Sequence, residues 1–278
     1  MSVDIGVPWT ARFFEGKTGW NKPETIVASI DQFIAATIAY GHIGWLVEEA
    51  HGTRQTCRSY YMLQQLQSRY VMEKPKEIRY GTTTGTLSTS EAFLSGRWKE
   101  SRLSIRYPNS LEIWINGNAA EPWKVTHQGT THVLPPYGWL AVGADGFLES
   151  SELASDGKRY DRVSSPEYVF VDGRGSPQTV DGVATSGSLA VRRNKEGNGL
   201  SLIAVEGVEG ITISSPKKSF GANDVRTEIA RVAKANRLSV RAFDMDGKDL
   251  GSATTAKTSS GWKIVSLAGS LRYEIQIK

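Results

Sequence analysis

The sequence predicts a mainly β protein, in which antiparallel β-sandwich modules follow a short α-helical segment. Two observations support this prediction. Apolar residues recur at helical spacing before residue 75, and after it they alternate in short runs. Turn residues separate these runs at intervals of about 8–12 residues, which is typical of antiparallel sandwiches. We expect three segments: a strand with two helices over 1–75, a first sandwich over 76–177 and a second sandwich over 178–278.

The first segment contains one strand pattern and two helical patterns. Residues 3–13 are predicted to form a strand that ends in a loop, and a helix is predicted to begin near Pro23, because proline is tolerated in the first helical turn. Its apolar stripe consists of Ile26, Val27, Ile30, Phe33, Ile34 and Ile38. The apolar face of a second helix, over residues 54–70, consists of Met62, Leu63, Leu66 and Tyr70. One strand and two helices are too few to form a stable core by themselves. These helices should therefore pack either on the β-domain or on protein that precedes them.

The second segment is predicted to consist of short strands. Alternating apolar residues flank the Pro108-Asn109-Ser110 turn, a pattern that indicates a hairpin. Residues 90–94 are predicted to form a single helical turn, and residues 135–139 a rigid corner. The Gly- and Pro-containing run 172–177 is predicted to be a boundary.

The last hundred residues continue the strand pattern. Strands are expected at 189–193, 200–205, 211–213, 238–243, 262–267 and 271–277. Residues 224–236 fit either a helix or an edge strand.

Composition narrows the classes of partner. The net charge is +4 and the basic residues are spread along the chain, whereas nucleic-acid binders concentrate them on one face, so no nucleic-acid partner is expected. No apolar run reaches the ~18 residues of a membrane span, and no secretory signal is visible. The sequence does not indicate the cellular compartment. The single cysteine, Cys57, excludes an intramolecular disulfide and a cysteine zinc site.

No motif in the sequence specifies a reaction or a cofactor. A phosphate-binding loop and a Gly-x-Ser-x-Gly elbow are both absent. His127 and His132 flank a turn, but no carboxylate accompanies them, so no metal is expected. Glu48 and Glu49 are adjacent, whereas glycoside hydrolysis needs two carboxylates that face each other across a cleft. A solvated helix end is the favoured interpretation of this pair.

Several segments resemble parts of glycoside-hydrolase-like proteins. Residues 40–45 (Tyr-Gly-His-Ile-Gly-Trp) and 59–66 (Ser-Tyr-Tyr-Met-Leu-Gln-Gln-Leu) are similar to the end of a (β/α)8 barrel in that family. Residues 104–111, 134–139 and 165–170 are similar to its C-terminal β-sandwich. The resemblance covers about residues 1–175. It implies that the chain is the C-terminal portion of such a protein, with the end of a barrel before the sandwich.

This resemblance implies a function that involves carbohydrate. Barrel enzymes place their catalytic groups at the ends of barrel strands, and most of these strands are missing, so the chain is not expected to be catalytically complete alone. With its missing part it would be a glycosidase. The candidate substrate contacts are Asp4, Trp9, Arg12 and His42, of which Asp4 and Arg12 flank the one expected barrel strand.

Two alternatives stay open. The chain is either this carbohydrate-active fragment or a carbohydrate-binding or structural β-sandwich protein without enzymatic activity. The apolar faces of residues 24–70 are expected to pack against a missing N-terminal domain or to self-associate, because large uncovered apolar patches usually mark interfaces.

Overall fold

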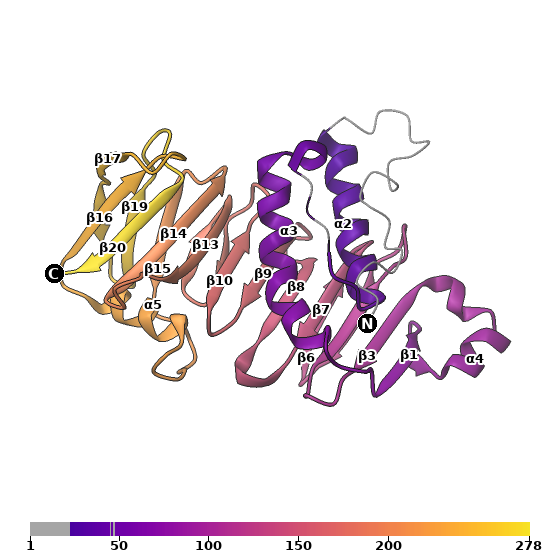
Figure 1. Cartoon of the computed structure of the whole chain (residues 1–278). Helices are drawn as coiled ribbons and strands as arrows, with labels where there is room; N and C mark the ends of the chain where they lie inside the picture. The colour runs from indigo at the N-terminus through magenta and orange to yellow at the C-terminus, as the bar shows by residue number, and fades with distance from the viewer. Residues whose placement is uncertain (1–22, 45, 47) are drawn as a thin grey trace. The chain divides into compact units, whose positions relative to one another are not determined.

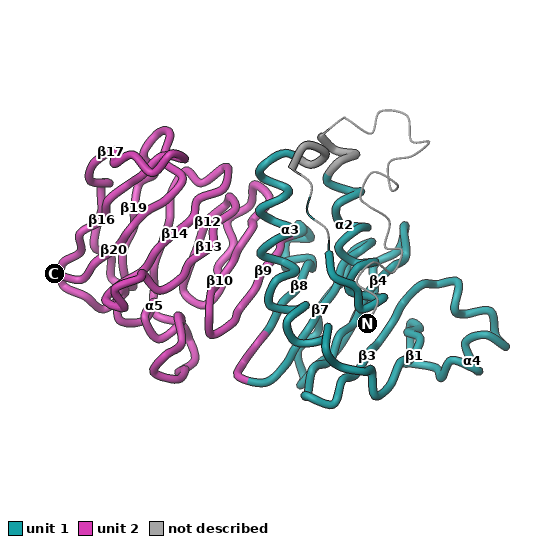
Figure 2. The backbone as a smooth tube through the Cα atoms, in the orientation of Figure 1, with its two compact units in different colours: residues 1–144, 148–159 teal, residues 145–147, 160–278 magenta. Residues whose placement is uncertain are grey.

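In a computed structural model, the chain is mainly β, with 40% of residues in strands and 22% in helices (Figure 1). The structure describes residues 23–44, 46 and 48–278. It divides into two compact units (Figure 2). Unit 1 comprises residues 1–144 and 148–159, and unit 2 comprises residues 145–147 and 160–278. Residues 172–177, the predicted boundary, lie inside unit 2.

Unit 1 is built on one antiparallel sheet. Its strands, in spatial order, are β2 (Thr86–Leu87), β1 (Glu77–Gly81), β3 (Arg102–Arg106), β4 (Glu112–Asn116), β7 (Gly138–Val142) and β8 (Leu148–Leu153). The predicted hairpin around Pro108 is confirmed, since β3 pairs with β4 and Ile105 lies opposite Ile113. The predicted turn at 90–94 is the short helix α4 (Thr89–Leu94), followed by the 3-10 helix η1 (Arg97–Glu100).

Helices and a hairpin cover this sheet. The helices α2 (Pro23–Ala39) and α3 (Glu48–Tyr70) lie across one face (Figure 1), where α2 packs on β4 and β7. The hairpin of β5 (Trp123–His127) and β6 (Thr130–Leu134) packs on β7 and β8. Its Trp123, Val125 and Leu134 form an apolar cluster with Leu140 of β7 and, at its margin, Trp114 of β4. The residues that alternate with this cluster along the sheet face the helices. Unit 1 is therefore an antiparallel sheet with helices on one face and a two-stranded hairpin on the other.

The two helical patterns are confirmed. α3 bends at Gly52, which is not helical (φ 73°, ψ 160°) and separates a short first part from the part that matches the predicted residues 54–70. Four residues of the apolar stripe of α2 are buried, since Ile30, Phe33, Ile34 and Ile38 are at most 1% exposed. The apolar face of α3 is buried as well. These buried residues belong to the same unit as the sheet, which agrees with the predicted packing on the β-domain.

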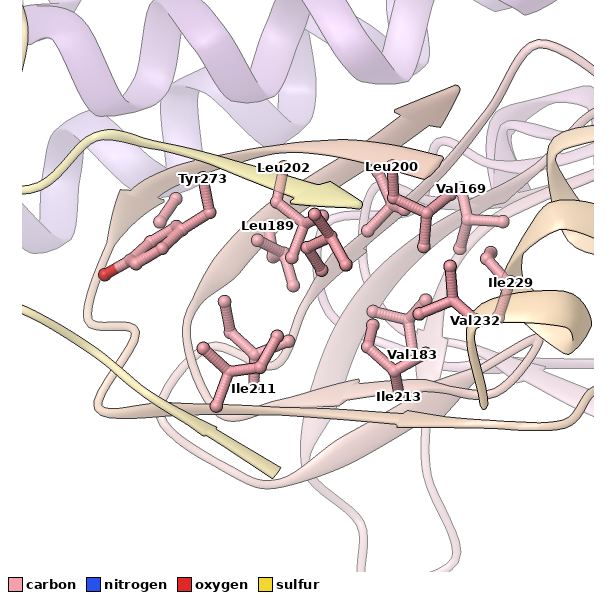
Figure 3. Packing of buried hydrophobic residues seen from close by; sticks show 14 of the residues in the cluster. Val169, Val183, Leu189, Leu200, Leu202, Ile211, Ile213, Ile229, Val232 and Tyr273 are labelled. Atoms are coloured by element: carbon pink, nitrogen blue, oxygen red, sulfur yellow. The ribbon is translucent and has the colours of Figure 1, made fainter. Parts of the chain in front are cut away.

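Unit 2 is an antiparallel sandwich with one helix. One sheet contains, in order, β9 (Arg159–Ser164), β10 (Tyr168–Asp172), β13 (Ser188–Arg193), β14 (Gly199–Glu206), β20 (Arg272–Ile277), β16 (Leu238–Phe243) and β17 (Asp249–Ser252). The other contains β11 (Gln178–Val180), β12 (Val183–Thr185), β15 (Gly210–Ser214), β19 (Gly261–Val265) and β18 (Thr255–Lys257). Apolar side chains from both sheets meet in one core (Figure 3), so the predicted sandwich architecture is confirmed here.

The ambiguous segment 224–236 contains a helix, α5 (Val225–Lys234). Asp224 caps its first turn, and Val225, Ile229 and Val232 enter the sandwich core at helical spacing. Burial of this one face is what selects a helix over an edge strand. Within the described part of the chain, no helix combines the length and the apolarity that crossing a membrane requires.

Candidate functional site

Three of the four predicted substrate contacts, Asp4, Trp9 and Arg12, lie outside the described residues. The fourth, His42, lies in the connection between α2 and α3. Its backbone carbonyl accepts hydrogen bonds from the Tyr70 hydroxyl at 2.7 Å and from Gln67 Nε2 at 3.5 Å. The backbone of His42 therefore anchors the connection to the end of α3, while contact between its ring and a substrate stays a prediction.

An ion-pair network links the two helices of unit 1 to the sheet. Asp31 Oδ1 lies 2.7 Å from Arg58 Nη2, and Asp31 Oδ2 lies 2.9 Å from Arg159 Nη1. The Arg159 guanidinium also donates to Ser151 Oγ at 2.8 Å and to two backbone carbonyls of the corner before β7. The Asp31 and Arg58 side chains are 5% and 1% exposed, respectively. One buried aspartate thus connects α2, α3 and the sheet.

A second buried carboxylate lies on the same face of the sheet. Glu149 is fully buried and accepts a hydrogen bond from Trp139 Nε1 at 3.0 Å. Tyr70, at the end of α3, stacks on Tyr107 with 6.2 Å between ring centroids. Burial raises the pKa of Tyr70 well above 10.0, and the negative charge of Glu149 raises it further. Tyr70 therefore stays a neutral hydrogen-bond donor across the ordinary pH range.

A third buried carboxylate lies on the opposite face. Glu152 accepts a hydrogen bond from Ser150 Oγ at 2.9 Å and lies 2.6 Å from His132 Nδ1 of the hairpin. The ring of His127 instead lies against Trp114, with 5.3 Å between centroids. His132 is opposite Val125 in the hairpin, so the two histidines do not face each other as a cross-strand pair. Among the residues with described positions, no group of three metal-ligating side chains comes together.

These carboxylates do not form a glycosidase pair. The two acids of such a pair face each other about 5–9.5 Å apart across a cleft. Glu149 and Glu152 are three positions apart in β8, so their side chains project to opposite faces. Asp31 is bound by two arginines. Each of these acids holds layers of unit 1 together.

In unit 2, buried acids also have cationic partners. Asp161 pairs with Arg174 at 3.0 Å, and Asp224 pairs with Arg226 at 2.6 Å. Arg226 is fully buried and also donates to the carbonyls of Asp145 and Gly146 and to Ser164 Oγ. These pairs anchor the loops around α5 and β9, a structural role.

One solvent-exposed feature of unit 1 is an aromatic surface, which we define as Phe93, Leu94 and Trp98. These side chains are 58%, 90% and 41% exposed. The rings of Phe93 and Trp98 are nearly parallel, with an interplanar angle of 13° and 5.4 Å between centroids. The ammonium group of Lys99 lies 5.9 Å from the centroid of the Trp98 ring. The surface is thus an aromatic pair beside a cation.

Local interactions hold the aromatic surface in place. Ser88 and Glu91 form a capping box, in which the Glu91 carboxylate accepts from the Ser88 backbone at 2.7 Å. At the other end, Ser95 Oγ donates to the Glu91 carbonyl at 2.6 Å, and Gly96 then turns the chain with φ 72°. The turn brings η1 back against α4, so the aromatic pair is arranged before any ligand arrives. Figure 1 shows α4 beyond β1 at the margin of the unit 1 sheet.

The sequence predicts residues 90–94 only as a helical turn, and this surface is not among the predicted sites. A signal was present. Ala92, Phe93 and Leu94 are consecutive in a helix of six residues. An α-helix has 3.6 residues per turn, so three consecutive side chains point in different directions and cannot all lie on one buried face. Only Ala92 of this helix is buried.

Comparison with known proteins gives no relative. No protein-family model matches the chain, and neither the curated proteins nor the solved structures contain a significant match.

Proposed function

We propose that this chain is a non-catalytic, carbohydrate-binding C-terminal portion of a glycoside-hydrolase-like protein. The observation that supports it is the exposed, nearly parallel pair of Phe93 and Trp98. Aromatic rings bind sugars by stacking on their CH-rich faces, and the indole N–H adds a donor. Adjacent exposed apolar side chains that form one patch are a feature of interaction sites.

The arrangement of the pair favours binding. Each ring limits the rotation of the other, and the capping box fixes the helix that carries Phe93. Side chains that are already ordered lose less conformational entropy when a ligand binds. A sugar ring can therefore contact this surface without a rearrangement of unit 1.

The buried acids support the non-catalytic part of the proposal. A glycosidase requires two carboxyl groups that a substrate can reach. Asp31, Glu149 and Glu152 are instead buried and bonded to arginine, tryptophan or histidine partners within unit 1. None of these three acids is therefore open to a substrate.

Binding and hydrolysis can be tested on the same preparation. Affinity electrophoresis in gels that contain soluble polysaccharides should show retardation of the chain, and a reducing-end assay should show no hydrolysis of the polymers that it binds. Trp98→Ala should weaken the retardation. Met245→Ala, which truncates an exposed methionine of unit 2 (78% exposed), is the matched control and should have no effect.

Two results would contradict the proposal. Failure to bind any polysaccharide in a panel of neutral and charged polymers would leave a structural β-sandwich protein as the better description. Release of reducing ends by the purified chain would show that it is catalytic by itself.

A further inference from the structure

The geometry points to a ligand class for the aromatic surface: a polysaccharide whose sugar rings bear an anionic group, with the sugar ring against the exposed part of the Phe93–Trp98 pair and the anion on Lys99. This inference rests on the proposed carbohydrate function and adds a chemical class and a charged contact. It follows from the way in which the charges around α4 and η1 are paired.

Both carboxylates of this segment are engaged locally. The Glu91 carboxylate accepts two hydrogen bonds from Ser88, from the backbone N–H and from the hydroxyl, each at 2.7 Å. The Glu100 carboxylate lies 2.6 Å from Arg97 Nη1 and 3.0 Å from Arg102 Nη1. Glu100 is therefore paired with two arginines, whereas Glu91 keeps its charge and is directed toward Ser88 at the start of α4.

Lys99 differs from these residues. It is exposed, and none of the ion pairs found among the described residues includes it. Its ammonium group lies 5.9 Å from the Trp98 ring centroid, a distance at which the ring and the cation attract each other. The cation beside the aromatic pair is therefore available to an anion from outside the chain.

The distances suit one sugar unit with an acidic substituent. A pyranose ring that contacts Trp98 places its substituents within reach of a lysine at this distance, because the lysine stem is flexible. A carboxylate or sulfate on that ring would make a charge-assisted hydrogen bond with the ammonium group. A neutral sugar could use the rings only.

The ligand class can be tested with polygalacturonate and alginate as carboxylated probes, dextran sulfate as a sulfated probe, and dextran and hydroxyethyl cellulose as neutral probes. We expect the full chain to bind an acidic polymer at least about tenfold more tightly than the neutral ones, from a contact of this kind. Binding should weaken as sodium chloride is raised, because salt screens exposed charges. The carboxylated and sulfated probes decide which anion is preferred.

Variants locate the contact on the surface. Trp98→Ala should weaken binding of the acidic polymer about tenfold, a change typical of losing an aromatic contact. Lys99→Gln should weaken it several-fold and abolish its salt dependence, whereas Lys99→Arg should retain both. The lysine variants change an exposed side chain, so they keep the test valid if Trp98→Ala perturbs folding. Met245→Ala should bind as the unmodified chain does.

Each other outcome overturns the inference in a distinct way. Equal binding of acidic and neutral polymers would refute the ligand class. Acidic-polymer binding that Trp98→Ala and Lys99→Gln leave unchanged would refute the site, while the proposed carbohydrate function would stand. No binding to any polymer would refute both. Sedimentation of the chain as a dimer that Trp98→Ala dissociates would assign the surface to a second copy.

Discussion

Asp31 of α2 and Arg58 of α3 form a buried ion pair, with 2.7 Å between Asp31 Oδ1 and Arg58 Nη2. The same aspartate bonds Arg159 through its other oxygen. The two arginines compensate the charge of the buried aspartate. The helix pair is therefore joined to the sheet by a polar contact as well as by apolar packing.

Removal of one partner of this pair should be costly. Arg58→Met should lower the free energy of unfolding by about 3–5 kcal/mol, because it leaves a buried carboxylate with less compensation. The double variant, in which Asp31→Asn is combined with Arg58→Met, should lose less unfolding free energy than the sum of the losses in the two single variants. Urea unfolding followed by circular dichroism measures both. Strictly additive losses would show that the pair is not coupled.

The Tyr70 hydroxyl should make stability depend on alkaline pH. Burial and the nearby Glu149 raise its pKa in the folded protein above the unfolded value of 10.0. Its contribution is therefore fully present below pH 10 and is lost as pH rises toward the folded value. Tyr70→Phe should cost about 1–3 kcal/mol at neutral pH, since the His42 carbonyl loses its closest donor, and should reduce the alkaline loss.

Urea midpoints at neutral and alkaline pH measure this effect. Tyr40→Phe, which changes an exposed tyrosine, is the control and should keep the full alkaline loss. An alkaline loss of the same size in Tyr70→Phe and in the unmodified chain would exclude Tyr70 as its source.

Gly81 should not tolerate a side chain. A Cβ atom at this position would lie 2.3 Å from the Trp123 ring, which packs the β5–β6 hairpin against the end of β1. Gly81→Ala should therefore destabilise unit 1 by about 1–3 kcal/mol through overpacking. Gly85→Ala is the matched control, because nothing lies within 4 Å of its Cβ position. Equal urea midpoints for the two variants would show that Trp123 moves aside freely.

The capping box should make the aromatic surface sensitive to acid. Hydrogen bonds from Ser88 lower the pKa of Glu91 below its usual 4.5. The stabilisation of α4 by the ionised Glu91 carboxylate is therefore present above pH 4.5, and it is lost as the pH falls through the lower pKa that Glu91 has in the folded protein. The Ser88 amide resonance in an NMR titration should shift in this acidic range. Glu91→Gln should remove the shift, and a shift that persists in this variant would have another origin.

Local patterns predicted individual elements well. The stripe that includes Ile30 and Ile34 predicted α2, and the alternation on each side of Pro108 predicted the β3–β4 hairpin, because helical and strand periodicities place apolar side chains on one face regardless of what covers it. The same periodicity could not show what lies opposite that face. The sequence therefore predicts the helices as a separate segment and does not decide what covers them.

The sequence by itself determined the antiparallel, mainly β character of the chain and the two helical patterns, since these depend on the spacing of apolar residues and turns. Only the tertiary structure decided which polar groups meet. Asp31 and Arg159 are 128 positions apart, and Phe93 becomes an exposed partner of Trp98 only when Gly96 turns the chain. Contacts between distant residues depend on how the elements pack, which local periodicity does not encode.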